Sequence, residues 1–416
     1  MSKVIDRIVP ARFGRSFRWL LASSWTTNLG DGIALAAGPL LVASLTDDAF
    51  LISLAALFGW APALLFGLYA GVLSDRHDRR RIVLAANAVR VAVLAVLITT
   101  VATGTLSAPG ALLALGLLAT TEVFADNTTA TLTPMLVPRA DLALANSRLQ
   151  TGFITFNQLA GPPIGAALFA AGSTWPFLTE IVLDVAGLLL VSRIVLPAHG
   201  RAAGAPVRGV WQDVVEGYRW TVRHPAVRTL MLIILIFNVT FGAAWSVLVL
   251  YAQDRLGLGS VGFGLLTTIS AIGGLLGTSM YGWLTRRVSL GNLMRAGLLL
   301  ETVTHLGLAV TRSGWVASVI FFLFGAHAFI WGTTSMTVRQ RAVPHHLQGR
   351  VGSLNTICVY GGLVVGAPIG GALAAGYGVT APFWFAFGGS VVFVVLLWRE
   401  MTHIAHADEQ PQPSAA

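Results

Sequence analysis

The chain has few charged residues. Only 11% of its 416 residues are Asp, Glu, Lys or Arg, whereas soluble proteins carry roughly 25%. Because 55% of the residues are apolar and the mean hydropathy is +0.74, we expect most of the protein surface to face lipid rather than water. This composition excludes a soluble enzyme and a disordered scaffold.

Cysteine and lysine are almost absent. The single cysteine, Cys358, excludes an internal disulfide, and it has no Cys or His partner at metal-ligand spacing. We expect neither a metal site nor a cofactor. The net charge of +9 comes almost entirely from arginine, since Lys3 is the only lysine. A basic chain can bind nucleic acid, but the placement of the arginines indicates another role.

Twelve apolar segments are long enough to cross a bilayer, which takes about 20 residues per helix. They cover residues 17–45, 51–74, 82–103, 110–136, 144–171, 176–196, 228–252, 261–284, 291–311, 315–338, 349–375 and 380–399. The sequence therefore predicts an all-α membrane protein with twelve transmembrane helices, and a lipid bilayer as its surroundings.

The arginines lie in alternate connections between these spans. Of the 27 basic residues, only Arg255 and Arg312 fall in connections after odd-numbered spans, and Arg90 lies within the third span. Cytoplasmic loops of membrane proteins are enriched in Lys and Arg. The pattern predicts a plasma-membrane protein with both termini in the cytoplasm, and it gives the arginines a topological role rather than one in binding nucleic acid.

The sequence contains an internal repeat. The fifth span has Gly161-Pro162-Pro163-Ile164-Gly165, and the eleventh has Gly366-Ala367-Pro368-Ile369-Gly370, 205 positions later. Repeated bundles of this kind are one route to alternating access in transporters. We expect a first six-helix bundle over residues 1–200, a cytoplasmic linker over 201–227, a second six-helix bundle over 228–402 and a disordered tail over 403–416.

The linker has an amphipathic segment. Apolar residues recur at helical spacing from Val210 to Val222, with charged residues between them, and Pro225 follows. The pattern predicts a short helix. It either lies on the cytoplasmic leaflet or packs on the protein as an ordinary linker helix.

The loop after the second span carries a recognisable motif. Its residues Gly71-Val72-Leu73-Ser74-Asp75-Arg76-His77-Asp78-Arg79-Arg80-Arg81 resemble the loop signature of the major facilitator superfamily. Asp78 departs from the pattern, since the family usually has a second glycine there. The resemblance implies two pseudo-symmetric six-helix bundles, and it assigns a gating role to Gly71, Asp75, Arg76 and Arg79.

Further segments resemble one branch of that family. Gly161, Pro162 and Gly165 are similar to the fifth-helix motif of its antiporters, with Asn157 where an earlier glycine is usual. Residues 133–138, Leu142 with 145–147, and 251–259 are similar to the branch that contains the enterobactin exporter and the macrolide-efflux proteins.

Six acidic residues fall within predicted spans, where a charge costs at least ~2.5 kcal/mol. They are Asp31, Glu122, Asp126, Glu180, Asp184 and Glu301. By the resemblance, helices one and four face a central cavity, whereas six and nine are peripheral. We therefore expect proton coupling by Asp31, Glu122 and Asp126, and structural roles for the other three. The alternative is that each acid only pairs with a buried donor, as we expect of Glu301 with His305, four residues on.

Aromatic and polar residues on the helices expected to line the cavity are candidates for binding a solute. They are Trp25, Asn28, Asn238, Phe241, Trp245, His327 and Trp331. Aromatic rings hold hydrophobic or cationic solutes. The alternatives are that the rings face lipid and that His327 is a hydrogen-bonded packing residue.

The resulting functional hypothesis is a secondary transporter that exports a small organic solute, such as a drug, secondary metabolite or siderophore, by proton antiport. The chain has no Walker phosphate loop and no set of nucleophile, base and orienting residue, so we expect neither an enzyme nor ATP-driven transport. We expect a monomer. The alternatives are an uptake symporter of a small nutrient and a non-transporting sensor or lipid scramblase on the same fold.

Asp75 is expected to pair with a guanidinium or with the positive end of a neighbouring helix and so to hold the cytoplasmic side closed. Asp75→Asn should therefore insert into the membrane in normal amounts but transport slowly in a cellular efflux assay. Full transport at normal expression would contradict a gating role for Asp75.

Overall fold

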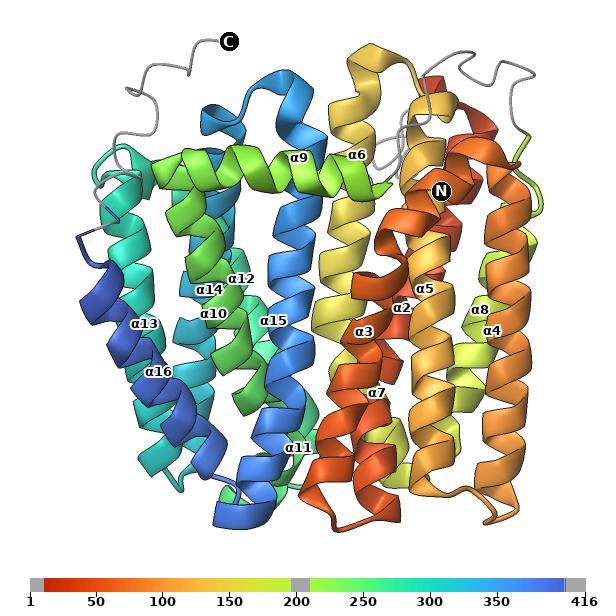
Figure 1. Ribbon diagram of the computed structural model, residues 1–416. Coiled ribbons are helices and arrows are strands. Elements are labelled where there is room, and N and C mark those ends of the chain that lie inside the picture. The colour runs from red at the N-terminus through yellow and green to blue at the C-terminus, as the bar shows by residue number, and fades with distance from the viewer. Residues whose placement is uncertain (1–10, 196–209, 400, 402–416) are drawn as a thin grey trace. The chain divides into compact units, whose positions relative to one another are not determined.

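The protein is described by a computed structural model that covers residues 11–195, 210–399 and 401 (Figure 1). The described residues form helices joined by short connections, without a β-strand. The chain divides into two compact units, Met1–Pro206 with Leu258–Thr268, and Val207–Gly257 with Ile269–Ala416. The expected disordered tail, 403–416, lies outside the described residues.

The first unit is a bundle of long helices. Its elements are η1 (Ala11–Phe13), α2 (Gly14–Leu45), α3 (Ala49–Arg76), α4 (Arg79–Ala102), α5 (Ala108–Leu136), η2 (Arg139–Asp141), α6 (Leu142–Gly152), η3 (Phe153–Ala160), α7 (Gly161–Ala171) and α8 (Trp175–Val191). Helix α2 is central, because it packs against α5, α7, α8 and the π-helix η3.

The second unit begins with the linker helix and continues as a second bundle. Its elements are α9 (Val210–Arg223), α10 (Pro225–Trp245), α11 (Leu248–Leu250), η4 (Tyr251–Arg255), α12 (Ser260–Thr285), α13 (Leu290–Val310), α14 (Gly314–Ala342), η5 (His345–Leu347), α15 (Gln348–Tyr377) and α16 (Ala381–Leu397). The start of α12 belongs to the first unit. Helix α10 packs along α15, and α13 packs against both α14 and α16.

All twelve predicted spans correspond to helical segments. Among the described residues, nine helices are long and apolar enough to cross a membrane. The fifth span is a continuous run of α6, η3 and α7, and the sixth and twelfth are the 17-residue helices α8 and α16. The prediction of an all-α membrane protein with twelve transmembrane helices is confirmed.

Polar side chains begin several of these helices. Asp48, Ser107 and Ser313 each accept a hydrogen bond from a backbone N–H in the first turn of the helix that follows. The first N–H groups of a helix have no partner within it, and a side-chain oxygen at this position supplies one. These residues account for the sharp boundaries of α3, α5 and α14.

Glycines allow the fifth span to lie directly against the first. A Cβ atom added at Gly161 would be 2.5 Å from the backbone of Gly32, and one at Gly165 would be 2.3 Å from the carbonyl oxygen of Ile33. An added Cβ at Gly32 would be 2.4 Å from the carbonyl oxygen of Asn157. The antiporter-like motif has Asn157 where a glycine is usual, and here Gly32 of α2 is the small residue at that contact. Small residues let the backbones of neighbouring helices approach closely.

The second unit uses the same packing device at the repeated motif. A Cβ atom at Gly366 of α15 would be 2.3 Å from the carbonyl oxygen of Val239, and one at Gly370 would be 2.0 Å from that of Ala243. Both carbonyls belong to α10. The repeat seen in the sequence is thus a repeat of helix contacts, the fifth span on the first and the eleventh on the seventh.

The linker helix α9 packs on protein by one face. Its Gly217 lies against α15, since a Cβ there would be 2.6 Å from the carbonyl oxygen of Arg350. Arg350 forms an ion pair with Asp213 at 3.0 Å and a second one with Glu216. Two acidic residues of the linker and one arginine of α15 therefore hold α9 in place.

The other face of α9 presents apolar side chains. Trp211 is 75% exposed and Tyr218, two turns later on the same face, is 56% exposed. The helix lies across the ends of α10 and α15 (Figure 1). The structure thus combines features of both interpretations of the linker, a helix packed on protein that also exposes an apolar face.

Gly165→Ala tests the close approach of α7 to α2. The added methyl group meets a rigid backbone carbonyl, so the helices must move apart, and overpacking of this kind costs about 1–3 kcal/mol. The measurement is the free energy of unfolding in detergent micelles. The matched control is Gly59→Ala, at a helical glycine with no atom within 4 Å of the added Cβ. Equal stability of the Gly165 and Gly59 variants would refute the contact.

Candidate functional site

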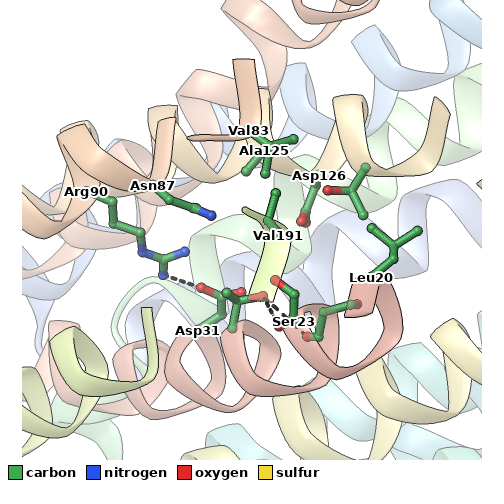
Figure 2. Close-up of a pocket in the computed structure, with 12 residues that line it drawn as sticks. Leu20, Ser23, Asp31, Val83, Asn87, Arg90, Ala125, Asp126 and Val191 are labelled. Carbon is green, nitrogen blue, oxygen red and sulfur yellow. Dashed lines mark hydrogen bonds and ion pairs between the residues drawn. The ribbon is translucent and has the colours of Figure 1, made fainter. Parts of the chain in front are cut away.

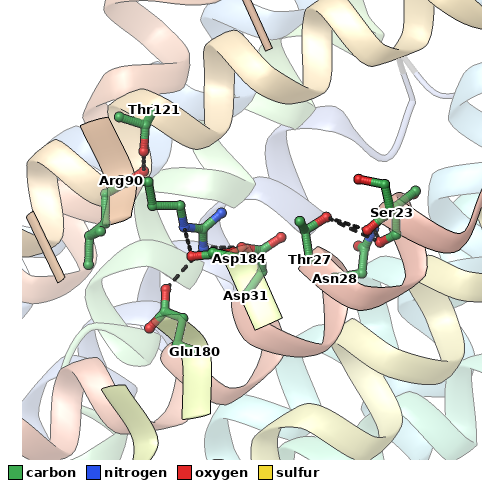
Figure 3. Close-up of polar contacts among 10 residues, drawn as sticks. Ser23, Thr27, Asn28, Asp31, Arg90, Thr121, Glu180 and Asp184 are labelled. Atoms are coloured by element: carbon green, nitrogen blue, oxygen red, sulfur yellow. Dashed lines mark hydrogen bonds and ion pairs between the residues drawn. The ribbon is translucent and has the colours of Figure 1, made fainter. Parts of the chain in front are cut away.

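A single arginine organises a buried ionic cluster in the first unit. Arg90 of α4 is 3% exposed. Its guanidinium forms an ion pair with Asp31 of α2, and lies 3.0 Å from Glu180 Oε1 and 2.9 Å from Asp184 Oδ2 on α8. Figure 3 shows that these side chains come from three helices and point toward one another. We call Arg90, Asp31, Glu180 and Asp184 the Arg90 cluster.

Local sequence places the acids of α8 against α2. Glu180 and Asp184 are four residues apart and so share one helix face. A Cβ atom at Gly30 of α2 would be 3.5 Å from Glu180 Cγ and 3.7 Å from Asp184 Oδ1. The Ser23 hydroxyl donates a hydrogen bond of 2.9 Å to the carbonyl oxygen of Gly187. Small residues on both helices therefore hold the acids close to Asp31.

A small polar cavity opens beside the cluster. Asp31, Arg90, Asn87 and Asp126 are in its wall (Figure 2). Glu180 and Asp184 are fully buried and do not line it. Asp31 is thus the acid of the cluster that both pairs with the guanidinium and lines the cavity.

The other two acids predicted for proton coupling lie on α5. Asp126 is exposed at the cavity wall, and Glu122 is one turn earlier on the same face and half-buried. Neither forms an ion pair with another described residue. The structure therefore places Asp31 and Asp126 at one cavity, while their role in proton coupling remains a prediction.

Arg90 was not predicted to be the centre of the site. The sequence shows it only as an arginine inside the third span. The signal was available, because a charged residue at membrane depth needs a buried partner of opposite sign, and four acidic residues lay in spans of the same predicted bundle besides Asp31. The structural role expected of Glu180 and Asp184 agrees with their ion pairs to Arg90.

Two cavity candidates in the first unit make local contacts instead. The Trp25 indole donates a hydrogen bond to the carbonyl oxygen of Arg148, and the Asn28 amide donates to that of Ser24. Neither residue lines the cavity beside Arg90. Their proposed part in binding a solute is therefore independent of that cavity.

The aromatic candidates of the second unit come together in one row. The rings of Trp331, Phe237, Phe241 and Trp245 are stacked in succession, with centroids 5.6, 5.9 and 4.3 Å apart. We call these four residues the aromatic row. They lie on α10 and α14 and are only partly buried. Asn238 is buried, and its amide donates to the carbonyl oxygen of Ile234 in its own helix.

His327 lies behind this row and contacts an acid. Its Nε2 is 3.0 Å from Glu301 Oε2, and His305 Nε2 is 2.7 Å from Glu301 Oε1. The expected pairing of Glu301 with His305 is confirmed. The structure adds His327 to it, in agreement with the alternative that His327 is a hydrogen-bonded residue within the protein.

The loop motif is described in part. Arg79 begins α4, and its Nη1 lies 3.2 Å from Met135 Sδ. A Cβ atom at Gly71 would meet no atom within 4 Å. The side chains of Asp75 and Arg76 lie outside the described part of the structure, so the gating role remains a prediction.

Asp78 explains how this loop departs from the family pattern. Its carboxylate accepts hydrogen bonds from the backbone N–H groups of Arg80 and Arg81 at the start of α4. The backbone there has φ of −121° at His77 and −64° at Asp78, so no residue needs the left-handed region that favours glycine. An aspartate at this position caps α4 without strain.

Comparison with known proteins assigns a family. Residues 9–415 match the family described as transmembrane secretion effector. The multidrug efflux pump Tap of Mycolicibacterium fortuitum is 29% identical over 88% of this chain and 90% of its own length. Macrolide efflux protein A of Streptococcus pyogenes is 24% identical over 85% of this chain and 87% of its own. The expected similarity to macrolide-efflux proteins is confirmed.

A solved structure shares the fold. It is the crystal structure of a bacterial homologue of the iron transporter ferroportin in an inward-facing state, with a TM-score of 0.72 and 18% sequence identity. The match covers 93% of this chain and 99% of that one. At this identity the likeness shows the fold alone.

Arg90→Leu tests whether one guanidinium holds the cluster together. Removing it leaves buried carboxylates without a counter-charge, which destabilises a protein by about 3–5 kcal/mol. The thermal stability in detergent should fall strongly at pH 7.5 and recover in part at pH 5, where protons replace the lost positive charge. The control is Arg81→Gln, because the Arg81 side chain is 87% exposed. A loss of stability that does not depend on pH would contradict this account.

Proposed function

Because this chain belongs to the major facilitator superfamily, in the family described as transmembrane secretion effector, we propose that it exports a small organic solute in exchange for protons. The observation that carries the proposal is Asp31, which pairs with Arg90 and also lines the polar cavity of the first unit.

An excess of acid around Arg90 supports proton binding. Asp31, Glu180 and Asp184 contact the guanidinium, and Glu122 and Asp126 lie on the neighbouring helix α5. If the three acids that contact Arg90 were ionised, three negative charges and one positive charge would give the buried cluster a net charge of −2, and Glu122 and Asp126 would add to the negative charge beside it. Charge withdrawn from water at this depth is costly unless it is compensated. The group therefore holds protons, and it releases them when a route to water or a cationic solute becomes available.

Asp31 is the acid best placed to exchange its proton. Protonation of Asp31 weakens its ion pair with Arg90, but the guanidinium stays held by Glu180 and Asp184. Those two acids are 0% exposed, whereas Asp31 is in the cavity wall. Asp126 at the same wall and Glu122 behind it then serve as further proton acceptors.

The transport cycle follows from this arrangement. A proton reaches Asp31 when the cavity opens to the outside, and it leaves when the cavity opens to the cytoplasm and a solute is loaded. Rocking of two repeated bundles exchanges access between the two sides in transporters of this architecture. The close backbone contacts at Gly165 and Gly370 let α7 and α15 move as rigid parts of their units.

The solute class follows from the aromatic row and from the relatives. Stacked rings at Phe237, Phe241 and Trp245 suit hydrophobic or cationic molecules. The similar proteins are named as multidrug and macrolide efflux proteins. The proposed cargo is therefore a drug, a secondary metabolite or a siderophore, carried by a monomer in the plasma membrane with both termini in the cytoplasm.

Asp31→Asn tests the coupling. In everted vesicles, addition of a macrolide antibiotic or ethidium should release protons with the wild type and should release none above background with the variant. Binding of the same compound to the purified variant should persist, because the solute site is separate. The matched control is Asp254→Asn, at an exposed acid of η4 that pairs with no described residue.

Three results would contradict the proposal in different ways. Unchanged proton release by Asp31→Asn would remove Asp31 from coupling. Net movement of the solute into the cytoplasm would indicate an uptake symporter. Lipid movement between leaflets without any movement of solute or protons would indicate a scramblase.

A further inference from the structure

The second unit contains a buried ionisable group of its own. Glu301 and His305 of α13 are 1% and 0% exposed, and His327 of α14 is 6% exposed. Both carboxylate oxygens of Glu301 face an imidazole Nε2, at 2.7 Å for His305 and 3.0 Å for His327. We call these three residues the Glu301 triad.

Hydrogen-bond chemistry determines where a proton can bind in the triad. An ionised carboxylate only accepts hydrogen bonds, so His327 donates its Nε2–H to Glu301 Oε2. The Nδ1 atom of His327 is then a bare acceptor. His305 has its Nε2 2.7 Å from Glu301 Oε1, but neither of its ring nitrogens has a hydrogen-bond partner among the described residues. The Nδ1 atoms of both histidines are buried. Since a neutral imidazole has one bare ring nitrogen, each histidine of the triad has a vacant position for one proton.

The charge of the triad is uncompensated when both imidazoles are neutral. One carboxylate then gives a net charge of −1 within the membrane-spanning part of the protein. The helices around the triad, α10, η4, α12, α13 and α14, carry other titratable residues. They are Arg228, Tyr251, Asp254, Arg255, Tyr281, Arg295, Arg339 and Arg341. Helix α16, which packs on α13, has none.

None of these residues supplies the missing positive charge. Arg295 is six positions from Glu301, about 9 Å along the helix, and it donates to the carbonyl oxygen of Trp398. Arg255 donates to the carbonyl oxygen of Thr311, beyond the other end of α13. The remaining arginines lie in the first turn of α10 and the last turn of α14. Compensation therefore has to come from a proton.

We propose that Glu301, His305 and His327 bind one proton as a unit, forming a second proton site that is separate from the Arg90 cluster. The proton comes from water and adds to the bare ring nitrogen of one imidazole, and the triad changes from a charge of −1 to neutral. A second proton would leave a buried net positive charge, so the triad accepts one proton where two isolated histidines would accept two.

The site adjoins the aromatic row. The ring of Trp245 meets that of His305 at 88° with centroids 6.3 Å apart, and Phe324 meets His327 at 86° and 5.3 Å. Phe324 also packs on Trp245 at 4.6 Å. The charge of the triad therefore changes directly behind the rings to which we assign solute binding.

Nitrogen NMR of histidine-labelled protein in nanodiscs tests this proposal without a transported solute. The ¹⁵N shifts distinguish neutral imidazole tautomers from imidazolium, and His305→Gln and His327→Gln identify the two signals. When the triad holds its proton, one imidazole should be an imidazolium while the other stays neutral. His346, which is exposed, gives the signal of a histidine outside the triad.

Variants separate the triad from other causes. His327→Gln keeps Glu301 and His305, so a single proton should now reside on His305. Glu301→Gln removes the negative charge, so neither imidazole should be charged at pH 6. Asp31→Asn should leave both signals unchanged, which keeps this test independent of the proposed proton antiport.

Two results would overturn the proposal. One is that His305 and His327 both remain neutral down to pH 5, which would make the triad a fixed packing element. The other is that both become imidazolium together as the pH falls, which would mean that they behave as isolated histidines. If Glu301→Gln does not fold, the two histidine variants alone decide between these outcomes.

Discussion

Arg90 places a permanent positive charge in a helix that must lie in hydrocarbon, and the first unit is arranged to neutralise it. The compensating acids come from α2 and α8, at positions 31, 180 and 184. Because the guanidinium has donors on several sides, three carboxylates can bind it at once. The helices that carry them must therefore pack at fixed distances, and Gly30 and Gly187 provide the room for α2 and α8 to do so.

The two units solve the same electrostatic problem with different chemistry. In the first, an arginine that stays charged is surrounded by more acids than it can neutralise. In the second, one acid lies between two histidines, whose side chains can be neutral or positively charged. Both arrangements leave a buried negative charge that a proton can cancel. We infer that protons have a place in each unit, and in the first unit Asp31 and Asp126 lie at the wall of a cavity.

Backbone contacts at glycines give these charges a rigid frame. Gly161 and Gly165 lie against α2, which carries Asp31, and Gly366 and Gly370 lie against α10, which carries the aromatic row except Trp331. A side chain at any of these positions would separate the helices, because the atoms it would meet are mainly backbone atoms. The helix that carries functional residues is thus the one that the repeated motif packs against in each unit.

The sequence by itself determined the number of spans, their boundaries to within several residues, and the internal repeat, since long apolar runs and the positions of arginine report directly on the membrane. It also predicted contacts within one helix, such as Glu301 with His305, because residues four positions apart share a face. It did not predict that His327 joins them or that Arg90 binds acids 59 and 90 positions away. Periodicity tells which residues share a face, but only the packing of α2, α4 and α8, and of α13 and α14, decided which faces meet. The roles of Arg90 and His327 depend on that packing, because a charge buried in a membrane takes its properties from its nearest partners.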